Sequence, residues 1–392
     1  MTQEKMYFYL TSSRAFILYL VFTLNAIYYV NDAGLNPLQL VLIGTIMELT
    51  VFLFELPTGI IADYFGRKKS VILGFFVIGL AHILEGSIPE FWAIAAASFL
   101  WGVGWTFISG AEQAWIADEL EGKNLDKVFL KGAKFSSYAS FVGIVCSVIL
   151  AKLFSVQLTI ILAGLLFLVV SVIASVWMKE TTFIRVTEVS MKLHVLKSIS
   201  SSWKQLRNNR TLKLLALVTL VIGLGSEGFD RLWGAHFLET FQLDEEQSIY
   251  WFGAFFAVAF ILNAFILNII EGINKKYFSV VLITVNILLL VMLLGFAYTG
   301  HFIVAIAFYW LIEGLRNVNY PLISVMTNER LESEGRATAL SMFGQMDAIG
   351  QIAGGPIIGL VALYTSISGG LAATALLILP TIIILLFMRR ER

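Results

Sequence analysis

Long apolar stretches alternate with short polar connections along all 392 residues of the chain. A helix needs about 20 apolar residues to cross a bilayer, and the stretches that reach this length predict twelve membrane-spanning helices, six in each half. The expected spans are residues 7–30, 38–62, 68–87, 91–117, 133–154, 157–178, 211–237, 248–270, 277–298, 301–327, 338–362 and 366–388. The first stretch is too long for a signal-peptide core and lacks a small-residue cleavage site, so a retained helix is expected there.

The positively charged residues predict how the spans are oriented. All but four of the 27 Lys and Arg residues lie at the two ends of the chain or on alternate connections, which fall on one side of the membrane. Cytoplasmic connections carry the excess of positive charge in membrane proteins, so both termini are expected in the cytoplasm. A bacterial plasma membrane is the expected location. The four exceptions are Arg14, Lys152, Arg231 and Arg316.

The longest connection predicts the division into domains. Residues 1–180 are expected to form one six-helix bundle, residues 181–210 a cytoplasmic linker, and residues 211–392 a second bundle. Within the linker, apolar residues recur at helical spacing between lysines, which is typical of an amphipathic helix lying among lipid headgroups. A partly disordered linker is the alternative. The apolar positions are Leu196, Ile199, Trp203 and Leu206.

The composition excludes several other classes of protein. Apolar residues make up 58% of the chain and charged residues 14%, whereas a soluble domain carries roughly a quarter charged residues. The single cysteine, Cys146, rules out an internal disulfide, and the four histidines lack metal-ligand spacing. The chain has no phosphate-binding Gly-rich loop and no net charge favouring nucleic acid. We therefore expect no cofactor, no metal and no enzymatic activity.

A polar motif joins the second and third predicted spans. Gly59 allows a neighbouring helix to approach closely, and Gly66 permits a tight turn. The carboxylate of Asp63 suits the amino end of another helix, whose dipole favours a negative charge. Arg67 is expected to reach a second acid, for which Asp118 at the inner end of the fourth span is the obvious partner. The alternative is that these charges serve only to orient the spans.

The motif reads Gly59-Ile60-Ile61-Ala62-Asp63-Tyr64-Phe65-Gly66-Arg67-Lys68 and resembles the signature of the major facilitator superfamily at the position where that family carries it. Ile61 and Tyr64 depart from the usual Leu and basic residue. The resemblance implies an all-α membrane fold of twelve helices in two six-helix bundles related by a pseudo-two-fold axis. It also implies that the motif charges latch the two halves together while the central cavity faces outwards.

Charged residues inside the predicted spans are candidate functional groups, because an ionised side chain costs roughly 2.5–3.5 kcal/mol at the middle of a bilayer. Arg14, Asp32 and Glu85 lie nearer the membrane edges, where they are expected to reach headgroups or water. The internal set, with the polar Asn25 of the first span, comprises Asn25, Glu48, Glu55, Glu112, Glu227, Asp230, Arg231, Glu313, Arg316 and Asp347.

Helical spacing indicates which of these charges share a surface. Glu227 and Asp230 are three residues apart, as are Glu313 and Arg316, so each pair can meet on one face. The second pair is equally consistent with a structural ion pair. In the resembled family, spans one, four, seven and ten line the central cavity, and most of these charges fall on such spans. The eleventh span is rich in glycine, at 350, 354, 355 and 359, which predicts close packing.

The sign of the internal charges favours protons and cations. Seven of the internal groups are acids and two are bases, and a carboxyl group in a low-dielectric surrounding holds its proton more readily. The segments Ser109–Asp118 and Ser226–Trp233 resemble the drug:proton antiporter-3 branch, which includes tetracycline- and macrolide-efflux-like proteins. The sequence therefore predicts proton-coupled efflux of a lipophilic or cationic small molecule by a monomer embedded in membrane lipids. Uptake or exchange of an endogenous metabolite is the alternative.

Overall fold

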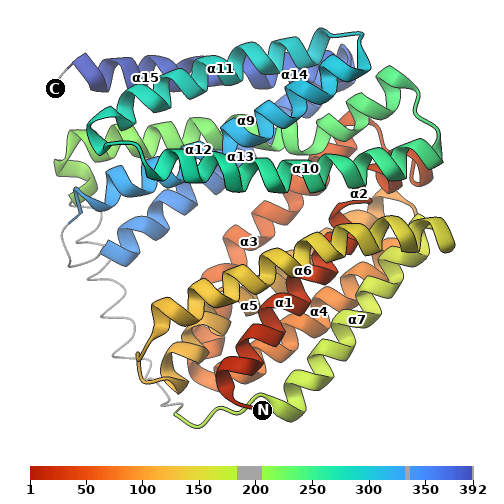
Figure 1. Cartoon of the computed structure of the whole chain (residues 1–392), viewed down its shortest axis with the longest axis vertical. Helices are drawn as coiled ribbons and strands as arrows, with labels where there is room; N and C mark the ends of the chain where they lie inside the picture. Colours follow the sequence, from red (N-terminus) through yellow and green to blue (C-terminus); the bar gives the residue numbers. More distant parts are fainter. Residues whose placement is uncertain (183–204, 332–335, 391–392) are drawn as a thin grey trace. The chain divides into compact units, whose positions relative to one another are not determined.

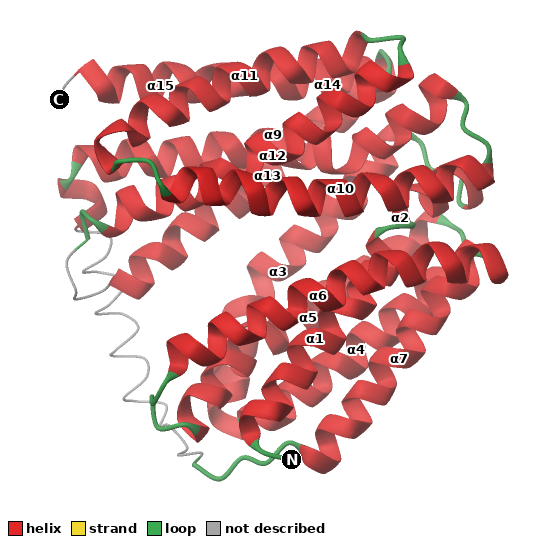
Figure 2. Ribbon diagram, in the orientation of Figure 1, coloured by secondary structure: helices red, strands yellow, loops and turns green. Residues whose placement is uncertain are grey.

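The computed structural model describes residues 1–182, 205–331 and 336–390, and all regular structure in these ranges is helical (Figure 2). The predicted amphipathic helix falls largely on residues 183–204, outside the described residues. Most helices correspond one to one with the predicted spans (Figure 1). Their bounds are α1 Gln3–Phe22, α2 Asn25–Ile27, η1 Tyr28–Asp32, α3 Pro37–Phe65, α4 Arg67–Ser87, α5 Phe91–Glu119, α6 Leu125–Leu153, α7 Val156–Trp177, α9 Arg210–Phe241, α10 Glu245–Glu271, η2 Lys275–Tyr277, α11 Phe278–Tyr298, α12 Phe302–Asn328, α13 Arg336–Tyr364, α14 Ile367–Leu376 and α15 Ile378–Arg390.

The chain forms helices because a backbone in lipid must satisfy its hydrogen bonds within its own segment. Eleven helical segments of the described residues are long and apolar enough to cross a membrane. The helix outside that set is α12, whose 27 residues span about 40 Å. Its polar side chains at positions 313, 316, 317 and 319 interrupt the apolar surface. The polar residues of this span are therefore candidate functional groups.

The first and last predicted spans are interrupted rather than continuous. The first ends as an α-helix at Phe22 and continues as the short α2 and the π-helical turn η1, a form that often accompanies functional sites. The last breaks between α14 and α15 at Leu377. Pro380 lies four residues after Leu376, so it cannot donate to that carbonyl and its ring crowds it. Each interrupted segment, Gln3–Asp32 and Ile367–Arg389, is still long and apolar enough to cross a membrane as one span, as the sequence predicts.

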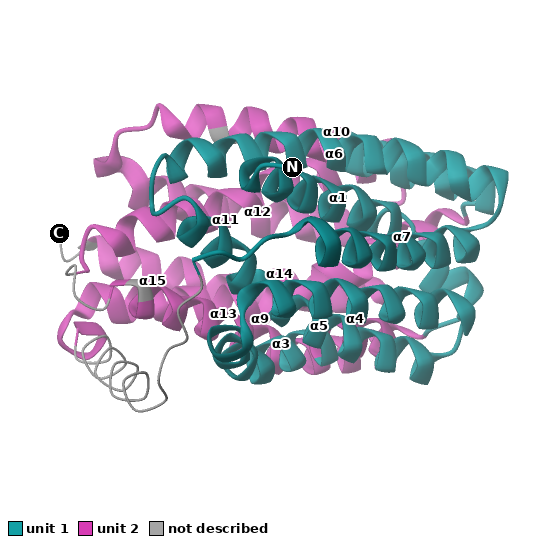
Figure 3. Ribbon diagram, turned by 90° about the horizontal axis from the view of Figure 1, so that it is seen from below, with its two compact units in different colours: residues 1–35, 46–187, 243–257 teal, residues 36–45, 188–242, 258–392 magenta. Residues whose placement is uncertain are grey.

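The described chain divides into two compact units (Figure 3). Unit 1 comprises Met1–Leu35, Ile46–Thr187 and Leu243–Ala257, and unit 2 comprises Asn36–Thr45, Glu188–Gln242 and Val258–Arg392. The beginning of α3 thus belongs to unit 2, and the beginning of α10 belongs to unit 1. The domain boundaries at 180 and 210 expected from the sequence stay a prediction.

Close helix crossings hold each unit together. In unit 1, a Cβ on Gly74 of α4 would lie 2.6 Å from the carbonyl of Gly104 on α5, and one on Gly79 would lie 2.9 Å from the carbonyl of Gly164 on α7. Both distances are too short for real atoms, so only glycine permits these backbones to approach. In unit 2, Gly350 and Gly354 of α13 lie against the backbone of α9 in the same way. The close packing predicted for the eleventh span is found there.

Candidate functional site

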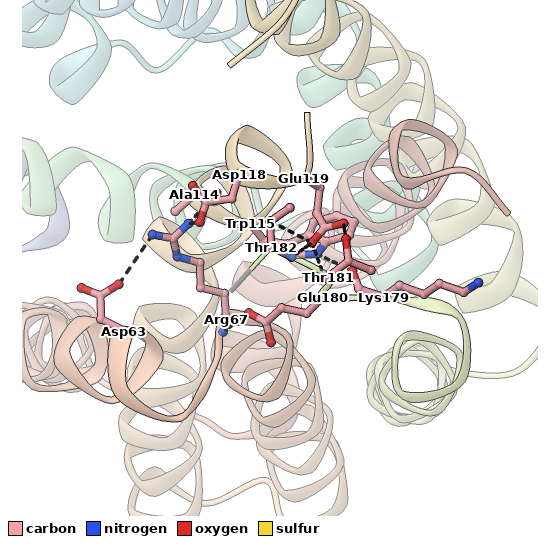
Figure 4. Close-up of polar contacts among 10 residues, drawn as sticks. All are labelled: Asp63, Arg67, Ala114, Trp115, Asp118, Glu119, Lys179, Glu180, Thr181 and Thr182. Atoms are coloured by element: carbon pink, nitrogen blue, oxygen red, sulfur yellow. Dashed lines mark hydrogen bonds and ion pairs between the residues drawn. The ribbon is translucent and has the colours of Figure 1, made fainter. Parts of the chain in front are cut away.

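The motif between α3 and α4 forms a compact polar cluster in unit 1 (Figure 4). Gly66 links the two helices with φ of 106°, a backbone conformation that L side chains rarely adopt. The Arg67 guanidinium forms an ion pair with Asp118 and donates a hydrogen bond of 2.7 Å to the carbonyl of Ala114. Asp63, near the end of α3 and four residues earlier in the sequence, lies 3.7 Å from the same guanidinium. The Arg67–Asp118 contact expected from the sequence is therefore present.

The segment that follows α7 fastens onto this cluster. The Glu180 carboxylate accepts a 2.7 Å hydrogen bond from the backbone N–H of Arg67. The Trp115 indole donates to the carbonyl of Lys179, at 2.8 Å. Glu119 accepts from the backbone N–H and the hydroxyl of Thr181, at 2.6 and 2.7 Å. Glu119 and Glu180 were missed by the sequence reasoning, because both lie outside the signature and nothing in their spacing relates them to it.

Gly59 differs from its expected role. It lies on the exposed surface of α3, and a Cβ added there would meet no atom within 4 Å. The described residues therefore hold no helix closely against Gly59.

The deep acid of α5 is paired with the arginine of α1. Glu112 is buried, with 3% of its side chain exposed, and it forms an ion pair with Arg14. The Arg14 guanidinium also lies 5.7 Å from the centre of the Trp105 ring. The Oε1 atom of Glu112 is buried with no hydrogen-bond partner among the described residues. The sequence analysis expected Arg14 to reach headgroups or water, and this was wrong because its guanidinium faces the buried acid Glu112.

The remaining candidates of unit 1 occupy α3 and the interrupted first span. Glu48 is half-buried and Glu55 is exposed, two turns apart on α3. Asn25 begins α2, and its Oδ1 atom is buried without a hydrogen-bond partner in the described ranges. An unsatisfied polar atom beside a helix interruption is uncommon in native structures. The side-chain carbonyl oxygen of Asn25 is therefore available to accept a hydrogen bond from a ligand or a water molecule at this interruption.

Three predicted residues of unit 2 meet in what we call the α9–α12 charge cluster, formed by Asp230, Glu313 and Arg316. The Arg316 guanidinium binds both carboxylate oxygens of Asp230, at 2.6 and 2.8 Å, and lies 3.4 Å from Glu313. The guanidinium carbon also lies 4.9 Å from the centre of the Phe229 ring. One arginine is thus shared by two carboxylates, one held bidentately and the other more loosely.

The charge cluster lines a cavity of about 210 Å³ within unit 2. Apolar residues of α9 and α11 form one part of its wall, and asparagines of α11 and α12 form another. The Asn286 amide donates to Asn319 at 2.9 Å. Thr381 is 1% exposed, and its hydroxyl has no hydrogen-bond partner within the described part of the chain. The polar side chains of the lining include Ser226, Asp230, Asn286, Glu313, Arg316, Asn317, Asn319, Tyr320, Thr374 and Thr381.

Glu227 pairs with an arginine on its own helix. Its carboxylate accepts from the Nε of Arg231 at 3.1 Å, one turn along α9, and 3% of the Glu227 side chain is exposed. The pair lies directly against Gly44 of α3, where an added Cβ would collide with both side chains. Gly44 could not be singled out from the sequence, because it lies in an apolar run and its partners are almost two hundred residues away.

Asp347 of α13 is bound by two neutral donors. The Tyr320 hydroxyl and the Gln351 amide both donate to its carboxylate, at 2.8 Å each. Tyr320 also lines the cavity, so Asp347 lies one hydrogen bond away from it. Tyr320 was not singled out from the sequence, where a tyrosine in a membrane helix more often marks an interface.

A buried polar network in unit 1 corrects the expectation for Glu85. The Glu85 side chain is 7% exposed. It accepts from the Tyr29 hydroxyl at 2.6 Å and faces the Nδ1 of His82 at 2.8 Å, while its backbone carbonyl accepts from the Tyr28 hydroxyl. Solvation was therefore the wrong expectation, because the tyrosines of η1 fold over α4 and cover the carboxylate. The sequence could not show that the first span bends at this point.

Comparison with known proteins identifies the family. The sequence profile of the Major Facilitator Superfamily matches residues 8–315, most of the chain. The chain belongs to the Major Facilitator Superfamily. One relative within the superfamily is the "Uncharacterized MFS-type transporter YxaM" of Bacillus subtilis (strain 168), 24% identical over 366 residues, or 91% of this chain and 89% of the relative. This member is therefore a multi-pass membrane transporter of small-molecule substrates.

Solved structures of other superfamily members share the fold. The nucleoside transporter NupG has a TM-score of 0.81 at 12% identity, with 100% of both chains covered. A peptide transporter, POT, in complex with sulfate has a TM-score of 0.78 at 14% identity, covering 99% of this chain and 94% of that one. At such identities the likeness concerns the fold alone. The predicted all-α membrane fold of twelve spans is confirmed.

Proposed function

We propose that this superfamily member is a proton-coupled secondary transporter that exports a lipophilic or cationic small molecule by alternating access. The observation that carries the proposal is the α9–α12 charge cluster in the wall of a cavity. Intramembrane acids that share one base are suited to bind and release a proton. Alternating access opens a fixed site of this kind first to one side of the membrane and then to the other.

The charges of the cluster suggest how a proton and a cation compete. With Asp230, Glu313 and Arg316 all ionised, the cluster carries one net negative charge, which attracts a cation to the cavity. A proton on Glu313 leaves the bidentate Asp230–Arg316 pair intact and the cluster neutral. Glu313 is the natural proton acceptor, because its contact with Arg316 is the longer one, at 3.4 Å. Proton binding then weakens cation binding, as exchange requires.

The other internal acids take supporting parts in this proposal. Glu112 and Glu227 are each compensated by an arginine, so protonation of either would release a guanidinium and change a helix contact. Asp347, held by neutral donors, is a second proton site next to the cavity. Glu48, Glu55 and Asn25 remain candidates for the substrate pathway on α3 and α2.

The α3–α4 motif is proposed to act as the gate at the Lys- and Arg-rich side of the membrane, which we take to be cytoplasmic. Its Arg67–Asp118 ion pair and its bonds to the segment after α7 make this end of unit 1 rigid. Rigidity at one end is what a latch between alternating states needs. Accessibility of a cysteine placed at the exposed position 389, in a protein whose Cys146 is replaced by serine, to a membrane-impermeant reagent tests the orientation, because labelling from outside intact cells would refute it.

Uptake or exchange of a polar metabolite is the second candidate function. The three asparagines of the cavity wall and the unpartnered Thr381 hydroxyl favour it, because amide and hydroxyl groups recognise neutral polar ligands. Direction separates the two functions. Vesicles containing the purified protein and carrying an inward proton gradient should expel a cationic substrate if the first proposal holds, and accumulate the substrate if the second one does.

The test of proton coupling uses variants of the cluster in the same vesicles. Glu313→Gln mimics the protonated side chain, so we expect transport driven by a pH gradient to fall to background while substrate exchange without a gradient persists. Glu121→Gln is the matched control, because Glu121 is an exposed acid beyond the end of α5. If Glu313→Gln, Asp230→Asn and Asp347→Asn all transport like the wild type under a proton gradient, the assigned coupling site is wrong.

A further inference from the structure

A groove opens on the side of unit 1 between α1, α6 and α7, which lie next to one another (Figure 1). Its volume is about 420 Å³. The wall is made largely by apolar side chains from all three helices, including Phe16, Val142, Leu166 and Val169. Val142 and Val169 are 50% and 51% exposed. Because all three helices are membrane-spanning, this exposed apolar surface lies where hydrocarbon is the solvent.

Polar groups gather at one end of the groove. Tyr9 and Ser12 of α1 and Tyr138 of α6 belong to its lining. Each lies closer to the amino end of its helix than the apolar residues that the same helix contributes, such as Phe16 and Val142. Tyrosine is enriched where a membrane helix reaches the headgroup level. The groove therefore runs from a polar mouth into an apolar interior, which is the polarity profile of a lipid.

Lysines continue the line of the groove beyond its mouth. The Nζ of Lys134 lies 5.8 Å from the centre of the Tyr138 ring, which places a cation directly at the polar end. Lys131 and Lys127 precede it by three and seven residues and are exposed, so all three lie on one face of α6. We call Lys127, Lys131 and Lys134 the lysine strip. Asp126 is the acid within α6, and the strip outweighs it three to one.

We propose that this groove binds an anionic diacyl phospholipid, with one acyl chain between α1, α6 and α7 and the phosphate at Lys131 and Lys134. Charge complementarity decides the ligand. A zwitterionic lipid would match the apolar wall but would leave the lysine strip without a counter-charge. Each lysine near a membrane surface contributes to the attraction of anionic lipid. The apolar wall of the groove contacts the acyl chain in place of neighbouring lipids. Ser12 and Ser13 line the groove between Tyr9 and Phe16 along α1, so their hydroxyls are available to the ester groups.

The bound lipid would also touch the charge pair of unit 1 indirectly. Arg14, the partner of Glu112, follows directly after Ser13 on α1. A chain seated in the groove therefore fixes one face of α1 while another face holds the ion pair.

Native mass spectrometry of the purified full chain tests the proposal. Protein exchanged into equal amounts of phosphatidylglycerol and phosphatidylcholine of the same chain length is expected to retain phosphatidylglycerol preferentially, by about tenfold or more given two neighbouring lysines. The double substitution Lys131→Gln/Lys134→Gln should abolish the preference. The control Lys123→Gln/Lys276→Gln removes the same charge from exposed sites outside the groove and should leave the preference intact.

A second variant tests the groove without altering charge. Val142→Trp fills the apolar interior from an exposed position, so it should reduce the bound phosphatidylglycerol while the lysine strip remains. Equal retention of the two lipids by the wild type would overturn the proposal. So would an unchanged preference in the Lys131→Gln/Lys134→Gln protein, or a protein dimer that occupies the groove and disappears in Val142→Trp.

Discussion

Replacing Asp230 with asparagine keeps the shape of the side chain but removes the charge that holds Arg316. The two hydrogen bonds of 2.6 and 2.8 Å form a bidentate pair, the strongest arrangement between these groups. Breaking a fully buried ion pair costs about 3–5 kcal/mol, whereas an exposed pair contributes about 0–1 kcal/mol. The side chains are 41% and 23% exposed, so we expect the free energy of unfolding to fall by about 1–2 kcal/mol.

The looser contact of the same cluster supplies an internal comparison. Glu313 lies 3.4 Å from Arg316 with a single contact, so Glu313→Gln is expected to cost less, about 0.5 kcal/mol. The assay is reversible denaturant unfolding of the purified chain in mixed micelles, with a double-mutant cycle between Asp230→Asn and Arg316→Gln. A coupling energy indistinguishable from zero, or a larger loss for Glu313→Gln than for Asp230→Asn, would refute the assignment of Asp230 as the main partner.

Three further substitutions are predicted to lower the free energy of unfolding in the same assay. Gly44→Ala places a methyl group on a buried ion pair, and overpacking of this kind costs about 1–3 kcal/mol. Gly66→Ala forces a side chain into a conformation reserved for glycine, at a cost of about 1–3 kcal/mol. Gly59→Ala, in open space on the same helix as Gly44, is the control for both and should lose nothing. Glu85→Leu removes the acceptor of the buried Tyr29 hydroxyl and should cost about 1–3 kcal/mol, and a protein as stable as the wild type would show that this network is not needed.

The apolar stretches of about 20 residues were enough to predict the helices, because a membrane span must be mostly apolar along its length. The same reasoning could not predict where a span breaks. The helices α1 and α14 end inside apolar runs, at Phe22 and Leu376, and the break at Leu377 depends on a proline three residues later. The contact between Arg67 and Asp118 was predictable because Arg67 belongs to the family signature, and a positive charge there requires an acid, which Asp118 supplies at the inner end of the fourth span.

The partners of the internal charges were less predictable, because pairing depends on which helix faces which. Arg14 and Glu85 both lie near the ends of predicted spans, where solvation is the simplest expectation. In the folded chain Arg14 turns inwards to Glu112, and the tyrosines of η1 cover Glu85. Neither outcome follows from spacing within one helix. By contrast, the proximity of Glu313 and Arg316 did follow from their spacing, and the addition of Asp230 required the crossing of α9 and α12.

The fastening of residues 179–182 onto the Arg67 cluster has a mechanical consequence. Residues 179–182 are hydrogen-bonded to Trp115 and Glu119 of α5, and Glu180 connects them to the first residue of α4. A force that pulls on the chain after residue 182 therefore acts on the turn at Gly66, because Glu180 is hydrogen-bonded to the backbone of Arg67. Inserting residues after position 182 should leave these hydrogen bonds intact. Glu180→Gln should weaken the bond to the Arg67 backbone, so that a force on the later chain no longer reaches Arg67.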